Sequence, residues 1–390
     1  MKFFRRHIAP MILAVLMIAS IFSSCQRKQL WLAQNGTLDI NVSVYDIQLE
    51  LLWGVNWKTE WQYLWDESDC GPIGYTEPQG VQANVYFIDE AFQRNWFTNK
   101  HFHNSNGGRV SLTTNQTYDM LFHNDDYSNI IIEEDRTDYA YYHATTRTNN
   151  NATYTRASYV NYNQPDQLFG TFLQKMYVSD DPEDYVIEKD EYGNPIYVYQ
   201  VEATLTPFTM IYLYQVMILN NYDEKGQRIA GAEGITANGM SGGVELFSRI
   251  TDDDNMVSVT QDDVKAMQTN RDLTLPDGTQ VVGDIMAARM QTWGLPGIDP
   301  LATTKTKSAV DIIDSTYVGV GLKLRNGAVY PIQQNVTEQM KQRPSGGVIT
   351  LVIDAAAIPD SIIGGKPQPG GGFDASVDDW ENEIESDITI

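Results

Sequence analysis

Short runs in which apolar and polar residues alternate recur along this chain, and they limit its fold more than any other feature. The run LDINVSVY, residues 38–45, is the clearest: Leu38, Ile40, Val42 and Val44 share one face, and Asp39, Asn41 and Ser43 share the other. A period of two with one polar face predicts a strand of an antiparallel sheet that has one side in water. Similar runs follow, separated by turn-forming segments such as SNGG and NDDYSN: GVQANVYFID, GRVSLTT, YDMLFHN and NIIIEED. Long helical patterns are absent, so an all-β protein is predicted.

The second half of the chain continues this pattern. Residues 209–219 are apolar on both faces, which predicts a central strand that is buried on two sides. The runs YVGVGLKLRNGAVYPI and SGGVITLVID predict further strands, and NVTEQMKQR between them predicts a short helix capped by Asn335 or Thr337. A chain of 390 residues exceeds what one core usually serves. We therefore expect two β-sandwich domains, residues 36–200 and 201–390.

The N-terminus has the layout of an export signal. Basic residues come first, an apolar run fills residues 8–22, and Ser23 and Ser24 precede Cys25. This order resembles a bacterial lipoprotein signal, in which cleavage before the cysteine is followed by acylation of its thiol, although Phe22 departs from the usual leucine. We expect a signal peptide at residues 1–24, lipidation of Cys25, a linker at 25–35, and anchoring in the outer membrane at the cell surface. The alternative is ordinary secretion, with Cys25 incidental.

Charge and cysteine content exclude several classes of function. The formal net charge is −24, so neither nucleic acid nor anionic lipid headgroups are expected as direct partners. If Cys25 is acylated, Cys70 has no partner and a disulfide framework is excluded. His101 and His103 have a spacing that could bind zinc, and residues 252–255 could offer oxygen ligands to calcium. Surface histidines and a solvated acidic loop are the favoured interpretations, so no metal, cofactor or enzymatic activity is predicted.

Four tryptophans recur every four residues in the segment WGVNWKTEWQYLW: Trp53, Trp57, Trp61 and Trp65. At helical spacing they would lie along one side of a helix. Two interpretations follow from this stripe. It can pack onto the first domain, or it can form an exposed aromatic strip that binds sugar.

The last residues alternate most regularly of all. In WENEIESDITI the apolar residues share one face and acidic residues fill the other; the apolar set is Trp380, Ile384, Ile388 and Ile390. A terminal strand over residues 379–390 is therefore predicted, after the Gly-rich stretch GGKPQPGGG. It can pair within the second domain, or it can be offered to another subunit by β-strand addition.

Taken together, the runs VEATLTPFTMIYLYQVMILNN, GMSGG and RPSGGVITLVID resemble the fimbrillin-like lipoproteins of Bacteroidales, which include shaft, anchor and tip proteins of type V pili. The segment GVQANVYFID and the strands after it resemble the first domain of an uncharacterised branch of these lipoproteins. The resemblance implies two tandem transthyretin-like antiparallel β-sandwiches, no catalytic site, and other fimbrial subunits or surface proteins as partners.

The resemblance also implies a mechanism of assembly. In polymerising members, a trypsin-like protease cuts after an Arg or Lys in the leader and frees the first strand, whose groove then accepts a strand from a neighbour. Arg27 and Lys28 could be cut in this way, but they precede the strand that begins near Leu38. Cleavage there would remove the lipid and leave the strand. We therefore expect an anchor or accessory subunit that acts by protein–protein contacts, with strand exchange as an open possibility and a surface glycan-binding lipoprotein as the alternative.

Overall fold

Strands dominate the computed structural model, which describes residues 35–45, 47–102, 107–134, 141–150, 159–189, 191–262, 264, 267–302 and 316–363. The helices among these residues are all short, and the longest has six residues, Thr337–Gln342. None of the described helices is long and apolar enough to cross a membrane. The prediction of an all-β protein is confirmed.

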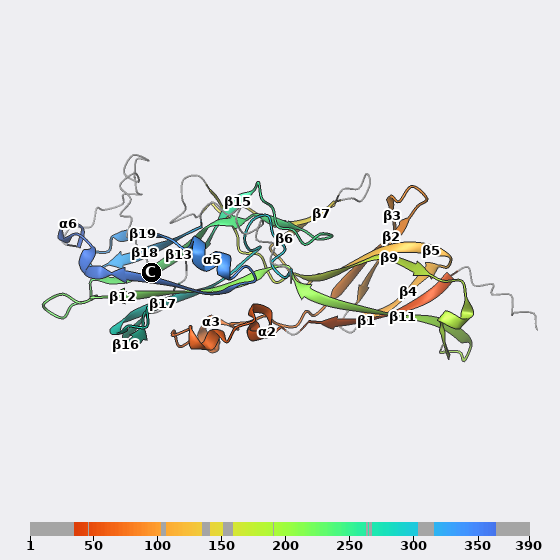
Figure 1. Ribbon diagram of the computed structural model, residues 1–390, viewed down its shortest axis with the longest axis horizontal. Helices are drawn as coiled ribbons and strands as arrows, with labels where there is room; N and C mark the ends of the chain where they lie inside the picture. Colours follow the sequence, from red (N-terminus) through yellow and green to blue (C-terminus); the bar gives the residue numbers. More distant parts are fainter. Residues whose placement is uncertain are drawn as a thin grey trace, which may run out of the picture.

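An eight-stranded sheet folds over itself into a two-layer sandwich, which we call the first sandwich (Figure 1). One layer has the order β3-β2-β5-β9 and the other has β11-β1-β4, with β10 paired to β11. The two layers join where Phe169 and Gly170 of β9 pair with the end of β11. The strands are β1 (Asn35–Val44), β2 (Val81–Ile88), β3 (Arg94–Phe102), β4 (Gly107–Thr113), β5 (Gln116–Asn124), β9 (Phe169–Val178), β10 (Val186–Lys189) and β11 (Pro195–Pro207).

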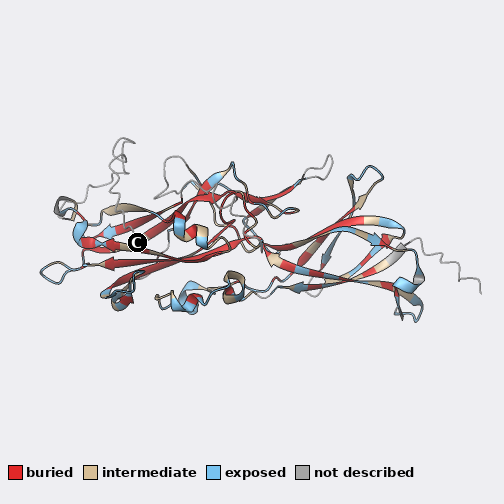
Figure 2. Ribbon diagram, viewed as in Figure 1, coloured by how far each residue is buried: buried red, intermediate tan, exposed pale blue. Residues whose placement is uncertain are grey.

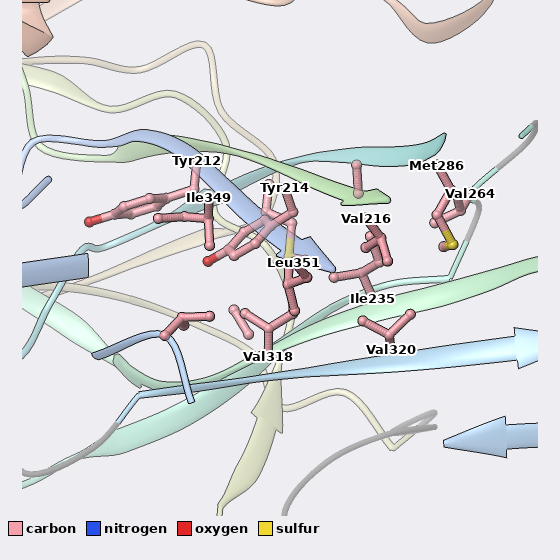
Figure 3. Packing of buried hydrophobic residues seen from close by; sticks show 14 of the residues in the cluster. Tyr212, Tyr214, Val216, Ile235, Val264, Met286, Val318, Val320, Ile349 and Leu351 are labelled. Carbon is pink, nitrogen blue, oxygen red and sulfur yellow. The ribbon is translucent and has the colours of Figure 1, made fainter. Parts of the chain in front are cut away.

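Two further sheets pack face to face as the second sandwich. One has the order β16-β17-β12-β20 and the other β19-β18-β13-β15-β8. Figure 3 shows the core between them, where Tyr212, Tyr214 and Val216 meet Val318 and Val320. The strands are β8 (Val160–Tyr162), β12 (Met210–Leu219), β13 (Ala230–Ser241), β15 (Met256–Gln261), β16 (Gln268–Thr274), β17 (Gln280–Thr292), β18 (Tyr317–Leu324), β19 (Val329–Asn335) and β20 (Gly347–Asp354).

A small three-stranded sheet lies between the two sandwiches. Its strands are β6 (Ile130–Glu134), β7 (Tyr142–Thr146) and β14 (Gly243–Glu245), in the order β14-β7-β6. Two strands from the predicted first domain therefore pair with strands from the second half of the chain: β7 pairs with β14, and β8 pairs with β15. The predicted boundary near residue 200 falls inside β11. The chain passes from one sandwich to the other at residues 208–209.

Several local predictions are confirmed, and two need correction. The first predicted strand is β1, but it pairs parallel with β11 as well as antiparallel with β4. β12 is buried on both faces, as its sequence predicts. The short helix is α5 (Thr337–Gln342); its cap position is Val336, although Asn335 Oδ1 accepts a hydrogen bond from the Thr337 amide at 2.9 Å.

Candidate binding surfaces

Strand β1 is seated in the middle of its layer, between β11 and β4. Its apolar face is inside the first sandwich, where Leu38 and Ile40 are fully buried and Val42 nearly so. Eight residues of β1, from Thr37 to Val44, are in register with β11. Burial of each such side chain stabilises the fold by about 1.5–3 kcal/mol. Removal of β1 would therefore open an apolar groove that another strand would have to fill.

The outward face of β1 is fixed by polar side chains. Asn41 Nδ2 donates to Gln200 Oε1 at 3.3 Å and to Glu202 Oε1 at 3.1 Å, and the Ser43 and Thr204 hydroxyls lie 3.1 Å apart. Both faces of β1 therefore contribute to the fold: the apolar residues pack in the core, and the polar residues form side-chain contacts with β11.

Residues 47–75 run from the end of β1 across the outer face of the second sandwich, and we call this segment the belt (Figure 1). It contains three short helices: α2 (Leu49–Trp53), η1 (Trp57–Thr59) and α3 (Glu67–Cys70). The expected single helix is wrong, because Gly54 at φ +68° ends α2 before the second tryptophan.

None of the four belt tryptophans is exposed. Trp57 is 7% exposed, and Trp53, Trp61 and Trp65 are intermediate. Trp53 and Trp57 pack edge to face at 6.1 Å, and Trp61 packs against Trp65 at 6.3 Å. The belt therefore lacks the exposed aromatic strip that stacking on sugar would need. Trp53, Trp57 and Trp61 belong instead to the apolar cluster that includes Ile211, Leu213 and Val348 on the outer face of β12 and β20.

Glutamine side chains fasten the belt to the second sandwich. Gln215 lies on the outer face of β12. Its side chain accepts from the backbone amide of Gln62 at 2.9 Å and donates to the backbone oxygen of Glu60 at 2.9 Å. Gln62 in turn bonds to both backbone groups of Thr274 in β16, and Gln268 bonds to both backbone groups of Leu64. A glutamine side chain carries both N–H donors and a carbonyl acceptor, so it can replace a backbone rung between two segments.

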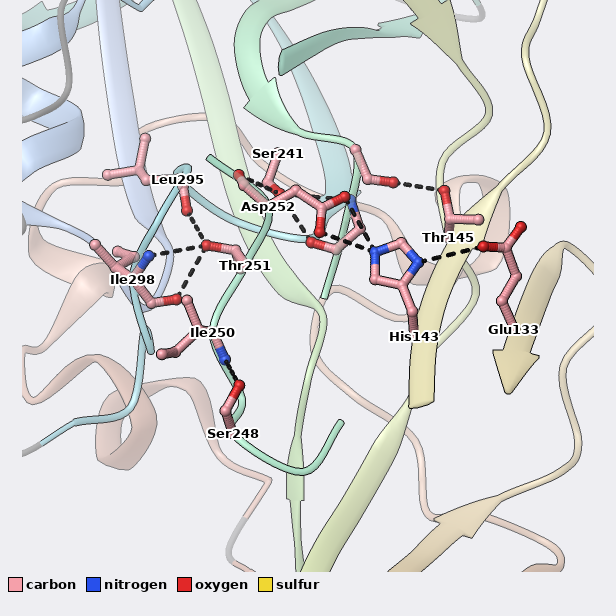
Figure 4. Close-up of polar contacts among 12 residues, drawn as sticks. Glu133, His143, Thr145, Ser241, Ser248, Ile250, Thr251, Asp252, Leu295 and Ile298 are labelled. Atoms are coloured by element: carbon pink, nitrogen blue, oxygen red, sulfur yellow. Dashed lines mark hydrogen bonds and ion pairs between the residues drawn. The ribbon is translucent and has the colours of Figure 1, made fainter. Parts of the chain in front are cut away.

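Among the described residues, two histidines are buried near the crossing between the sandwiches, His123 and His143. His143 Nε2 donates to Asp252 Oδ1 at 2.9 Å, and Glu133 Oε2 lies 3.9 Å from Nδ1. Both contacts are drawn as dashed lines in Figure 4. The acidic loop that begins at Asp252 is thus tied to β7. A Cβ on Gly243 would clash with His143 Nε2, so the last glycine of GMSGG makes room for this contact. Among the described residues, no three His, Cys, Asp or Glu side chains could hold a metal ion.

A cavity of about 350 Å³ opens where three loops of the first sandwich meet, and it is lined by Thr76, Pro78, Asn124, Asp126, Tyr127, Ser128, Asp166, Gln167 and Phe169. Its two carboxylates serve the loops themselves. Asp126 accepts from the Gln79 amide at 2.8 Å, and Asp166 accepts from the Ser128 amide at 2.6 Å. Asp166 Oδ2 also accepts from the Ser128 hydroxyl at 3.1 Å, so this carboxylate holds both the backbone amide and the side chain of Ser128.

The remaining predicted site residues lie outside the described residues. These are the lipidation site Cys25, the cleavage candidates Arg27 and Lys28, and the terminal-strand residues Trp380, Ile384, Ile388 and Ile390. His103 also lies outside them. Cys70 is a free, exposed thiol at the end of α3.

No family model and no curated protein matches this chain. Solved structures of similar proteins exist. A candidate adhesin from Bacteroides ovatus has 13% identity and a TM-score of 0.46, covering 85% of this chain and 96% of its own. A candidate adhesin from Bacteroides thetaiotaomicron has 10% identity and a TM-score of 0.42, with coverage of 82% and 92%. The fimbrial anchor protein Mfa2 from Porphyromonas gingivalis has 9% identity and a TM-score of 0.35, with coverage of 82% and 90%. These are adhesin and fimbrial proteins of Bacteroidales, the group that the sequence resemblance names.

Proposed function

We propose that this protein is a lipid-anchored fimbrial subunit of the anchor or accessory type, held at the surface of the outer membrane and acting through protein–protein contacts. The observation that carries the proposal is the seating of β1. Its apolar face completes the core of the first sandwich, and its polar face is laddered to β11. A subunit that keeps this strand has no open groove at this position.

The distribution of basic residues supports the same proposal. Between Lys28 and Lys58 the sequence contains no Lys or Arg. A trypsin-like cut after Arg27 or Lys28 would therefore leave β1 in place. A cut after Lys58 would divide the belt at η1, within a segment that packs on the second sandwich.

The direction of β1 gives the anchored protein an orientation. β1 starts at the end of the first sandwich that faces away from the second sandwich and runs toward the second sandwich (Figure 1). Asn35 is ten positions after Cys25, a reach of at most about 35 Å. An acyl chain on Cys25 would thus hold the first sandwich near the membrane, with the second sandwich projecting outward.

Strand exchange through residues 379–390 is the finer part of the proposal. If these residues pair within their own second sandwich, the subunit ends an assembly. If they enter another subunit, the protein continues one.

Replacement of Cys25 tests the anchor. Cys25→Ser protein should leave the membrane fraction, and wild-type protein on intact cells should be cleaved by added protease. A Cys25→Ala variant is the matched control, since it also lacks the thiol and should behave identically. Cys25→Ser protein that still sediments with membranes after a salt wash would refute lipid anchoring, and protection of wild type on intact cells would refute surface exposure.

A further inference from the structure

Strand β10 is an edge strand whose two faces are both open to solvent. It pairs with β11 on one side, and none of the described strands pairs with its other side. Val186 is 53% exposed and Ile187 is 63% exposed, and consecutive residues of a strand point to opposite faces. An exposed apolar edge is a template for another strand, and proteins normally protect such edges. Nothing among the described residues covers this one.

Acidic residues surround β10. Residues 179–191 contain seven acidic residues and one basic residue, Lys189. Asp180, Asp181, Glu183, Asp184 and Glu191 are exposed. Figure 2 shows pale-blue exposed ribbon at the end of the first sandwich that faces away from the second sandwich. We call β10 and these flanking residues the acidic edge. Because the whole chain carries a net charge of −24, a second copy would be repelled from it. Charge complementarity calls for a basic partner.

The acidic edge is held in one conformation by its own contacts. Tyr185 is buried, its hydroxyl donates to Ser179 O at 2.5 Å, and its ring packs on Tyr199 at 5.7 Å. The Asp181 amide donates to Ser179 Oγ at 3.0 Å, and the Glu183 amide donates to Asp181 Oδ1 at 3.0 Å. A partner that binds here would therefore lose little free energy to ordering of this surface.

The acidic edge also lies beside the start of the chain's first strand. Val198 of β11 pairs with Thr37 of β1 on one side and with Val186 of β10 on the other. β10 is therefore two strand spacings, about 10 Å, from the start of β1. If the proposed lipid anchor is correct, this surface faces partners close to the membrane.

We propose that β10 accepts, by β-strand addition, a basic extended segment of a partner protein in which apolar residues alternate with Lys or Arg. Backbone hydrogen bonds along the edge would give affinity, Val186 and Ile187 would meet the apolar side chains, and the surrounding carboxylates would select the basic ones. This inference rests on the proposed function in protein–protein contacts and specifies the chemistry of the partner. It does not depend on acylation of Cys25.

A peptide-binding experiment tests this proposal with the mature protein purified in detergent. The probe is a fluorescent eight-residue peptide of alternating Lys and Val, and the control peptide alternates Lys and Gly. The Lys-Val peptide should bind, with an affinity that falls as salt rises, and the Lys-Gly peptide should bind at least tenfold more weakly. Ile187→Lys should lower the Lys-Val affinity at least tenfold. Val282→Lys is the matched control, because Val282 is 64% exposed on β17 and lies in the other sandwich.

Three results would overturn the proposal. Equal binding of the two peptides would mean that charge alone attracts them, and equal effects of the two lysine variants would place binding elsewhere. If wild type does not bind but Arg27→Gln/Lys28→Gln protein does, the chain's own leader occupies the edge. Each result is independent of the fractionation of Cys25→Ser protein, so failure here leaves the anchor proposal standing.

Discussion

The two buried histidines of the described residues each have a hydrogen-bond partner that is distant in the sequence, Asn84 for His123 and Asp252 for His143. His123 is 1% exposed; Asn84 Nδ2 donates to its Nε2 at 3.2 Å, and its Nδ1 donates to Asn124 O at 2.8 Å. This pattern requires the neutral imidazole, since a proton on Nε2 would face another donor. Burial accordingly lowers the pKa of His123 below its usual value of 6.5.

The lowered pKa of His123 predicts a loss of stability in acid. Below pH about 6.5 the unfolded chain binds a proton at this residue that the folded chain does not, so the free energy of unfolding falls as pH falls. The contribution is at most about 1.4 kcal/mol per pH unit, and it ends at the folded-state pKa. Urea unfolding at pH 7.5, 6.5 and 5.5 should show a shallower pH dependence for His123→Gln than for wild type. Parallel curves would mean that the pKa of His123 is the same in the folded and unfolded proteins.

At the scale of elements, the alternation of apolar and polar residues predicted strands best where one face of the strand is buried and the other is exposed. Residues 38–44 are such a case, and their pattern alone predicted β1. The prediction of one helix through the belt was wrong, because a spacing of four residues does not show whether the residues between the tryptophans are helical. Gly54 ends the first helix, α2, after Trp53. The contact of His143 with Asp252 joins residues 109 positions apart, and no local pattern encodes it. Likewise, the parallel pairing of β1 with β11 depends on the order of strands in space.

The edge strands of the two sandwiches differ in how far their open backbone groups are covered. The open side of β20 is covered by side-chain amides. Gln339 of α5 donates to Thr350 O at 3.0 Å and accepts from the Thr350 amide at 3.0 Å, and Gln334 donates to Val352 O at 2.7 Å. These contacts occupy the backbone groups that an added strand would need. β10 has no such cover among the described residues.

Gln339→Ala should uncover the edge of β20. Two backbone groups of Thr350 would lose their partners, which should lower the free energy of unfolding by about 1–3 kcal/mol. The uncovered edge should also promote pairing between molecules, visible by light scattering as a larger species. Gln342→Ala, at an exposed position of the same helix, should change neither property. An unchanged Gln339→Ala protein would mean that water replaces the glutamine without cost.

At the scale of the whole molecule, the belt joins the two sandwiches into one body. The apolar cluster of the first sandwich continues through the belt to Ile211, Leu213 and Val348 of the second. Tyr75, at the end of the belt, donates its hydroxyl to Thr209 O at 2.5 Å, at the crossing point of the chain. If the proposed lipid anchor is correct, a pull on it would therefore be transmitted across both sandwiches.

Arg289 is the residue on which this coupling can be tested. It lies on β17 of the second sandwich, and it donates to the belt at Ile73 O (2.9 Å) and Gly74 O (3.3 Å). Burial lowers the pKa of its guanidinium. Arg289→Met keeps the bulk of the side chain but leaves two carbonyl groups without their donor, which should lower the free energy of unfolding by about 2–3 kcal/mol.

Calorimetry and hydrogen exchange would report the coupling directly. Wild type should unfold in a single transition, and Arg289→Met should show two, with faster amide exchange in residues 47–75 than in either sandwich. Arg325→Met is the matched control, because Arg325 pairs with Asp223 at an exposed position and should contribute less than about 1 kcal/mol. A single transition with unchanged exchange in Arg289→Met would show that the tryptophans alone hold the belt on the second sandwich.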